Sequence, residues 1–314
     1  EMNKIKILIT GGAGYIGSKL STKLVSSRYK VTVLDNLKFD DASLNHIFSY
    51  TNFNFIKGDV RNKKLLKSLV KKNDIIIPLA GLVGAPLCEK FKKYATEINL
   101  NNIKYIVNIL NNNQKIIYPT SNSGYGVGKK NKYCDENSPL NPISHYGITK
   151  SEAEKAVLKF KNSICFRLAT VFGYSYRMRT DLLVNNFVYK AIKENKLELY
   201  ESHFRRNFIH INDVVDAFEF AIKNFNNLRG ETYNLGLSTA NINKLQLAKK
   251  IKKNLKNLRI VIRENKKDPD KRDYFVSNRK IEKKGFKAKI TLDDGIKELV
   301  NIFKYSKIKI KNNY

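Results

Sequence analysis

Short apolar runs rich in Ile, Val and Leu alternate with longer amphipathic segments along the first half of the chain. Such runs predict buried β-strands, and the segments between them are long enough for crossover helices. The predicted strands cover residues 5–10, 30–35, 53–57, 74–79, 115–119 and 163–168. Regular alternation of strand and helix favours an α/β fold with a doubly wound parallel sheet.

This alternation loosens after about residue 170. Residues 174–206 form a basic stretch rich in Tyr and Asn, whereas residues 207–215 and 232–236 again look like elements of the main sheet. We therefore expect a nucleotide-binding domain and a smaller α/β lobe. The expected domain covers residues 1–169, with 207–237 returning to it, and the lobe is formed by residues 170–206 and 238–314.

A glycine-rich turn follows the first predicted strand. Gly11 permits the tight turn, Gly14 lets the backbone approach a phosphate, and Gly17 lets the next helix lie close to the sheet. The N–H groups at the start of that helix then face the anion. The turn is typical of Rossmann-type dinucleotide sites, and its residues Tyr15 and Ile16 are expected to contact the cofactor.

Asp35 ends the second predicted strand. A carboxylate there can accept hydrogen bonds from the adenosine ribose, and it would repel a 2′-phosphate. The glycine turn and this acid together predict NAD rather than NADP as the cofactor.

The composition, 42% hydrophobic over 314 residues, supports one large domain or two closely joined ones. The longest apolar stretch, residues 75–87, is interrupted by Pro and Gly and is too short for a membrane helix. Cys88, Cys134 and Cys165 show neither a disulfide nor a zinc-ligand pattern. We therefore expect a cytoplasmic protein that holds no metal and binds no membrane.

The net charge of +31 raises the question of a nucleic-acid partner. The basic residues are spread along the chain, and no recognition helix, RNP or zinc-finger pattern accompanies them. We predict no nucleic-acid partner, and expect the charge to attract anionic substrates such as nucleotide diphosphates.

A tyrosine four residues before a lysine can act as a base, because both side chains share one helical face and the ammonium can lower the phenol pKa. This spacing alone decides nothing, since it occurs at Tyr15/Lys19, Tyr125/Lys129, Tyr146/Lys150, Tyr189/Lys193 and Tyr305/Lys309. Only Tyr146 begins a predicted helix one crossover after a strand whose carboxyl end faces the ligand crevice. At that strand end, Ser121 either shares a substrate atom with the Tyr146 phenol or only caps the turn.

In these motifs the chain resembles, over nearly its full length, the extended short-chain dehydrogenase/reductase family of NAD-dependent nucleotide-sugar epimerases and dehydratases. The resemblance implies that Ser121, Tyr146 and Lys150 form the catalytic triad and that Arg206 and Arg272 grip a substrate diphosphate, a role that suits guanidinium groups. The further cofactor contacts that it implies are Asp35, Asn36, Asp59, Val60, Leu79, Ala80, Gly81 and Asn99.

The family mechanism implied is removal of a sugar proton by Tyr146 and of a hydride by NAD, at C4 in our interpretation. Return of the hydride to the other face gives a 4-epimerase, whereas release of the ketosugar gives a 4-dehydrogenase. In 4,6-dehydratases an Asp-Glu pair follows the catalytic hydroxyl. Asn122 and Ser123 stand there in this chain, so dehydration is not expected.

Four segments look closer to the GDP-glycero-manno-heptose 4-dehydrogenases of bacterial capsule synthesis, which favours a GDP-linked over a UDP-linked sugar. They are residues 82–88, 118–126, 177–183 and 268–274. The expected substrate contacts are Val83, Ser123, Arg177, Asn185, Arg206 and Arg272, although residues 174–186 could instead be a polar surface loop.

The family commonly dimerises through two helices per subunit, here residues 94–112 and 146–161, so a homodimer is expected. The alternative from another class is a dinucleotide-binding or nucleic-acid-associated protein that has lost the chemistry.

Overall fold

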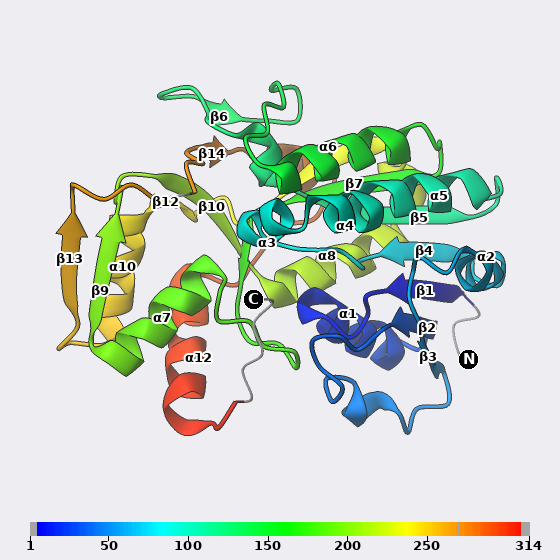
Figure 1. The fold of residues 1–314 in the computed structure, drawn as a ribbon, viewed down its shortest axis with the longest axis horizontal. Helices are drawn as coiled ribbons and strands as arrows, with labels where there is room; N and C mark the ends of the chain where they lie inside the picture. The colour runs from blue at the N-terminus through cyan, green and yellow to red at the C-terminus, as the bar shows by residue number, and fades with distance from the viewer. Residues whose placement is uncertain (1–4, 269, 309–314) are drawn as a thin grey trace.

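A computed structural model describes residues 5–268 and 270–308. Its centre is a seven-stranded parallel sheet in the order β11-β7-β5-β4-β1-β2-β3 (Figure 1). The strands are β1 (Lys6–Thr10), β2 (Lys30–Asp35), β3 (Phe53–Lys57), β4 (Ile75–Pro78), β5 (Lys115–Ser121), β7 (Ser163–Leu168) and β11 (Glu231–Leu235). The six predicted strands and the predicted fold class are therefore confirmed, and β5 is two residues longer than predicted.

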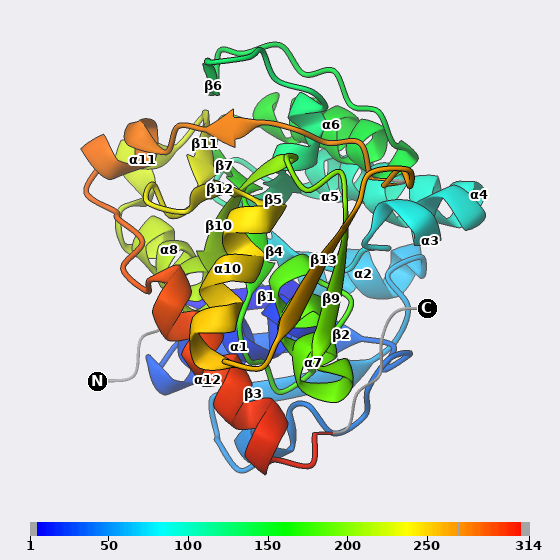
Figure 2. The same ribbon diagram turned by 90° about the vertical axis from the view of Figure 1, so that its left-hand side faces the viewer.

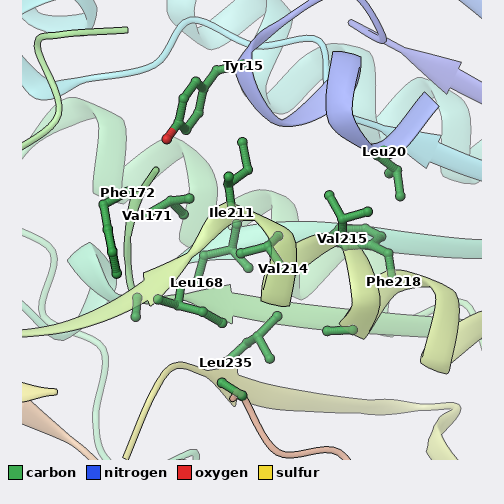
Figure 3. Packing of buried hydrophobic residues seen from close by; sticks show 14 of the residues in the cluster. Tyr15, Leu20, Leu168, Val171, Phe172, Ile211, Val214, Val215, Phe218 and Leu235 are labelled. Atoms are coloured by element: carbon green, nitrogen blue, oxygen red, sulfur yellow. The ribbon is translucent and has the colours of Figure 1, made fainter. Parts of the chain in front are cut away.

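Side chains alternate between the two faces of this sheet, as the period of a strand requires. In β1, Ile7 and Ile9 belong to one buried cluster and Leu8 belongs to another. Helices α1 (Tyr15–Ser26), α8 (Ile211–Lys223) and α9 (Phe225–Leu228) cover the first face, and Figure 3 shows apolar side chains of α1, β7 and α8 gathered there.

The second face is covered by α2 (Lys63–Lys71), by α6 (His145–Leu158) and by a run of three short helices. The run comprises α4 (Lys92–Thr96), the π-helical turn η2 (Glu97–Asn101) and α5 (Asn102–Ile109). The long helix predicted at residues 94–112 is thus interrupted by a π-turn, which carries the buried Asn99. The preceding loop carries α3 (Ala85–Lys90).

The remaining elements gather at the carboxyl side of the sheet (Figure 2). A three-stranded sheet contains β8 (Thr170–Phe172), β10 (Arg205–His210) and β12 (Asn241–Asn243), and two further pairs are β9 (Lys196–Tyr200) with β13 (Arg259–Arg263) and β6 (Tyr133–Cys134) with β14 (Phe275–Val276). The helices here are α7 (Leu183–Glu194), α10 (Lys244–Asn254), α11 (Arg279–Lys283) and α12 (Leu292–Tyr305), and single turns are η1 (Asn45–Ile47) and η3 (Asn122–Tyr125).

The expectation that residues 207–215 return to the main sheet is wrong in part. β11 does join the main sheet beside β7, but β10 pairs with β8 and β12 in the small sheet. The division of the chain into two lobes stays a prediction.

Neighbours β1 and β4 mark the point at which the strand order reverses. In doubly wound folds, ligands bind outside the carboxyl ends of the strands at such a point. The fold therefore directs attention to the loops that follow Thr10 and Pro78.

Candidate active site

A cavity opens at this switch point. Its predicted cofactor and substrate residues come from the glycine turn, from the ends of β2, β3 and β4, from α6 and from the segment after β8. They are Gly11, Gly14, Tyr15, Ile16, Gly17, Asp35, Asn36, Asp59, Val60, Leu79, Ala80, Gly81, Val83, Tyr146, Lys150 and Arg177. The cavity also has lining residues that were not predicted from the sequence, among them Lys38, Phe39, Tyr94 and Thr120.

The glycine turn is shaped by close backbone contacts. Gly11 has φ +71°, and a Cβ atom built on it would lie 2.5 Å from the backbone nitrogen of Ala80. A Cβ atom on Gly17 would lie 2.2 Å from the Gly11 carbonyl oxygen, so only glycine lets α1 start this close to the turn. Gly14 precedes α1 without a side-chain cap, which leaves the first-turn N–H groups for an anion. The turn fits a pyrophosphate.

Asp35 lies at the ribose end expected for such a ligand. Its carboxylate oxygens accept hydrogen bonds from the Leu37 N–H at 2.8 Å and the Ala13 N–H at 3.0 Å. Burial raises the pKa of this carboxyl above its ordinary value, although the backbone donors and Arg177 oppose the shift. The carboxylate lines the cavity and fits a cofactor without a 2′-phosphate.

Asn99 does not line the cavity where a direct cofactor contact had been predicted. It is 2% exposed, and its amide both accepts from the Leu82 N–H and donates to the Leu82 carbonyl oxygen, each at 2.8 Å. Asn99 therefore holds the loop after β4, whose residues do line the cavity.

Tyr146 and Lys150 project from the first turns of α6 into the same cavity. Ser144 starts this helix by accepting a hydrogen bond from the Gly147 N–H at 3.1 Å. Ser121, at the end of β5, accepts a hydrogen bond from the Ser123 N–H at 3.1 Å, and its hydroxyl is among the groups that lower the pKa of the Tyr146 phenol. The turn-cap interpretation of Ser121 thus holds in the structure, and a substrate atom shared with the phenol stays a prediction.

The electrostatics of the pair differ from the sequence-based argument. Burial raises the pKa of Tyr146 to about 12, and the groups that oppose this rise are the guanidiniums of Arg272 and Arg179 and the Ser121 hydroxyl. Burial lowers the pKa of Lys150 to about 7. Lys150 is not among the groups that oppose this rise most, so the expected effect of its ammonium on the phenol pKa stays a prediction. Use of Tyr146 as a base requires further positive charge or hydrogen bonds at its oxygen.

The two arginines predicted to bind a diphosphate lie together. The Asp270 carboxylate pairs with Arg272 at 2.6 Å and with Arg206 at 3.2 Å, and these arginines hold the pKa of Asp270 well below its usual range. Arg206 and Arg272 do not line the cofactor cavity, but the Arg272 charge reaches the Tyr146 phenol. Pro269, in the same motif, lies outside the described residues.

The segment after β8 is not a surface loop. Arg177 and Arg179 are 2% and 5% exposed and line the cavity. The Arg177 guanidinium lies 5.0 Å from the centre of the Phe39 ring, and burial lowers its pKa to about 10 while Asp35 opposes the change. This places Arg177 at the cofactor end of the cavity rather than at the sugar end that had been expected.

Asn185 is also away from the predicted position. It is fully buried on α7, where its amide accepts from the Gly173 N–H at 3.0 Å and donates to the Tyr15 hydroxyl at 3.2 Å. The Tyr15 hydroxyl in turn donates to the Gly173 carbonyl oxygen at 2.6 Å. Asn185 therefore connects the glycine turn to the segment after β8 instead of lining the cavity. Ser123, 2% exposed, also lies outside the lining.

The residues that the structure describes hold no group of His, Cys, Asp and Glu side chains that could bind a metal ion. Within the same residues, no helix combines the length and apolar character that crossing a membrane demands.

This arrangement is shared with known proteins. The model of the NAD dependent epimerase/dehydratase family matches residues 7–236, so the chain belongs to that family. The resemblance inferred from the sequence and the predicted NAD dependence are thereby confirmed, and the protein is an enzyme of this nucleotide-sugar family.

Individual relatives are distant. A dTDP-D-glucose 4,6-dehydratase of Dictyostelium discoideum is 29% identical over 270 residues, which are 78% of this chain and 61% of the relative. A putative UDP-glucose 4-epimerase of Methanocaldococcus jannaschii is 27% identical, over 95% of this chain and 98% of the relative. The crystal structure of a Bacillus anthracis dTDP-glucose 4,6-dehydratase in complex with NAD superimposes with a TM-score of 0.83 at 22% identity, covering 96% of this chain and 97% of that one.

Proposed function

We propose that this enzyme oxidises C4 of a nucleotide-linked sugar, as a GDP-heptose or GDP-hexose 4-dehydrogenase of bacterial surface-polysaccharide biosynthesis. The observation that carries the proposal is that Tyr146 and Lys150 line the same cavity as the glycine turn. None of the other tyrosine–lysine pairs of this spacing has both of its side chains in the lining of this cavity. Tyr305 is 83% exposed, and the Tyr125 hydroxyl donates to Asn234 at 2.7 Å away from the cavity lining.

In the proposed mechanism each residue has one task. Tyr146 takes the proton of the C4 hydroxyl, and Ser121 donates a hydrogen bond to the sugar oxygen. Lys150 binds the ribose of the cofactor. When bound, NAD supplies the positive charge that favours the phenolate and accepts the hydride.

The diphosphate part of the substrate is assigned to Arg206 and Arg272. Their shared partner Asp270 keeps two like charges side by side, and both guanidiniums can turn to phosphate oxygens with two-pronged hydrogen bonds. The Arg272 charge acts on Tyr146, which supports a substrate that runs from these arginines to the phenol. The preference for a GDP-linked sugar rests only on the resemblance of residues 82–88, 118–126, 177–183 and 268–274 to GDP-heptose 4-dehydrogenases.

Dehydration is not proposed, because Asn122 and Ser123 lack the carboxylates with which an acid-base pair removes water. Epimerisation at C4 is the second candidate. It needs the same proton and hydride removal, and the relative from Methanocaldococcus jannaschii carries the name of such an enzyme.

The test is incubation of the purified protein with NAD and a panel of GDP- and UDP-linked hexoses and heptoses, with reduced-nicotinamide absorbance and product mass followed together. Accumulating NADH with loss of two hydrogens identifies a 4-dehydrogenase. An isomer of unchanged mass without lasting absorbance identifies a 4-epimerase. If no sugar in the panel changes the absorbance or the product mass, a non-catalytic protein is favoured. In that case, a steep fall of the affinity for a polynucleotide with rising salt concentration would support nucleic-acid binding.

The proposed homodimer has a separate test. Ile148 is 45% exposed on the outer side of α6, within one of the two helices expected at the interface. Ile148→Lys should convert a dimer to a monomer in size-exclusion chromatography with light scattering. An unchanged dimer would place the interface elsewhere.

A further inference from the structure

Lys150 has an unusual environment for an ammonium group. Its side chain is partly buried where it lines the cavity, and this burial lowers its pKa to about 7. Among residues 5–268 and 270–308 no hydrogen bond or ion pair to its Nζ atom is found. A partly buried charge without such a partner is costly, so a neighbouring group that stabilises it matters for its charge state.

That group is the aromatic ring of Tyr118. Lys150 Nζ lies 4.2 Å from the centre of the ring, well inside the range of a cation–π interaction. Tyr118 is 1% exposed on the central strand β5, in the cluster between the sheet and α6. Its hydroxyl has no hydrogen-bond partner within the described part of the chain, so the ring face is the part of Tyr118 that contacts a charge.

The other titratable groups that face Lys150 cannot stabilise its ammonium in place of the Tyr118 ring. Glu154 lies one turn further along α6, but its carboxylate is already bound by Arg167 at 2.6 Å. Cys165 of β7 and Cys88 of α3 are thiols whose pKa is raised by burial, that of Cys88 to about 12. Both thiols are therefore uncharged at neutral pH.

We propose that Tyr118 is a positioning residue of the cofactor site, whose ring face holds the Lys150 ammonium at the wall of the cavity. The proposal rests on the function proposed above, in which Lys150 binds the cofactor ribose. It adds that the ring keeps Lys150 protonated until the ribose hydroxyls accept its hydrogen bonds. Tyr118, on β5 beneath α6, thereby controls the pH range in which the cofactor binds well.

The sign of the effect follows from the charge. The ring stabilises the ammonium, so removing the ring lowers the pKa of Lys150 further, and the amine is neutral over more of the neutral pH range. A neutral amine forms weaker hydrogen bonds to hydroxyl oxygens than an ammonium does. The affinity for NAD should therefore fall at neutral pH and recover when the pH is lowered.

The experiment measures NAD affinity by isothermal titration calorimetry between pH 5.5 and 8.5, which requires no sugar substrate. In the unchanged protein, affinity should decline as the pH rises through about 7, the pKa of Lys150. Tyr118→Leu should move this decline lower by about one pH unit, which is about a tenfold loss of affinity at pH 7.5. Tyr118→Phe keeps the ring and is expected to restore most of the affinity. Circular-dichroism melting confirms that each variant is folded.

Two outcomes overturn the role of the ring. One is a pH profile of Tyr118→Leu that superimposes on that of the unchanged protein. The other is an equal shift in Tyr118→Phe, which would assign the effect to the hydroxyl. Lys150→Met separates this failure from that of the proposed function. If that variant keeps the original pH dependence, Lys150 does not bind the ribose, and both proposals are wrong.

Discussion

Glu154 and Arg167 form a buried two-pronged ion pair between α6 and β7. The Arg167 Nη2 atom lies 2.6 Å from Glu154 Oε1, and Arg167 Nε lies 3.1 Å from Glu154 Oε2. Thr120 of β5 donates to the same carboxylate at 3.0 Å. Because Glu154 stands on the same helix as Tyr146 and Lys150, the pair ties the proposed catalytic helix to two strands of the sheet.

Glu154→Ala should therefore destabilise the whole domain. Removal of one partner leaves the Arg167 charge buried and unpaired, and we expect a loss of about 3–5 kcal/mol in the free energy of unfolding. Urea denaturation followed by circular dichroism measures it.

The matched control is Glu152→Ala on the same helix. Glu152 pairs with Lys155 at 2.7 Å, but the two side chains are 46% and 65% exposed. Its loss should change the free energy of unfolding by no more than about 1 kcal/mol. Equal losses in the two variants would mean that burial of the Glu154 pair does not matter to stability.

Tyr146→Phe should abolish turnover while NAD affinity stays nearly unchanged. The variant lacks the oxygen that takes the proton but keeps the ring that lines the cavity, and loss of a general base costs about 10²–10⁴-fold in rate. The measurement is kcat on whichever nucleotide sugar the panel identifies, together with calorimetric NAD binding.

Tyr189→Phe is the control, because Tyr189 on α7 has the same spacing to Lys193 but does not line the cavity. Its turnover should be unchanged. Persistent turnover in Tyr146→Phe would show that the catalytic assignment is wrong.

Substitution of Gly14 and of Gly17, which flank the first turn of α1, should damage different properties: Gly17→Ala the stability and Gly14→Ala the binding of NAD. In Gly17→Ala the new methyl group meets the Gly11 carbonyl at 2.2 Å, a backbone clash that we expect to cost roughly 1–3 kcal/mol of stability. In Gly14→Ala the corresponding distance is 3.2 Å, so the fold should tolerate the change. The methyl group added by Gly14→Ala would instead stand where the pyrophosphate approaches, and NAD affinity should fall at least about tenfold.

Thermal melting and calorimetry on both variants separate these effects. A Gly14→Ala protein that melts early and binds NAD normally would reverse the roles given to the two residues.

The elements read correctly from the sequence are those whose signal is local. The strands β4 and β7 are buried on both faces and therefore appear as unbroken apolar runs, and the glycine turn follows directly after β1. The π-turn that carries Asn99 depends on contacts with Leu82, 17 residues away, and no local pattern announces it.

The site residues that were misplaced depend on still more distant partners. Asn185 meets the Tyr15 hydroxyl across 170 residues, and Arg177 meets Phe39, which lines the same cavity. The side-chain types of Asn185 and Arg177 identified these residues as polar groups near a nucleotide site. Only the fold decides whether such a group lines the cavity or lies behind its wall. Tyr118 gave no signal at all, since an aromatic residue in an apolar strand is indistinguishable from core in the sequence.

Lys150→Met should raise stability even though it damages cofactor binding. The pKa of Lys150 is about 7 in the folded protein and about 10.5 in an exposed lysine, so the unfolded chain binds more protons between these values. Stability of the unchanged protein therefore rises with pH in that window, and the buried ammonium costs most at pH 7 and below. Methionine removes this cost, and we expect a gain of roughly 2–4 kcal/mol at pH 6.5 that shrinks toward pH 10. Urea denaturation at pH 6.5 and 9.5 tests it, with Lys155→Met as the exposed control; a gain that does not depend on pH would mean that packing, and not the charge, is what Lys150 costs the fold.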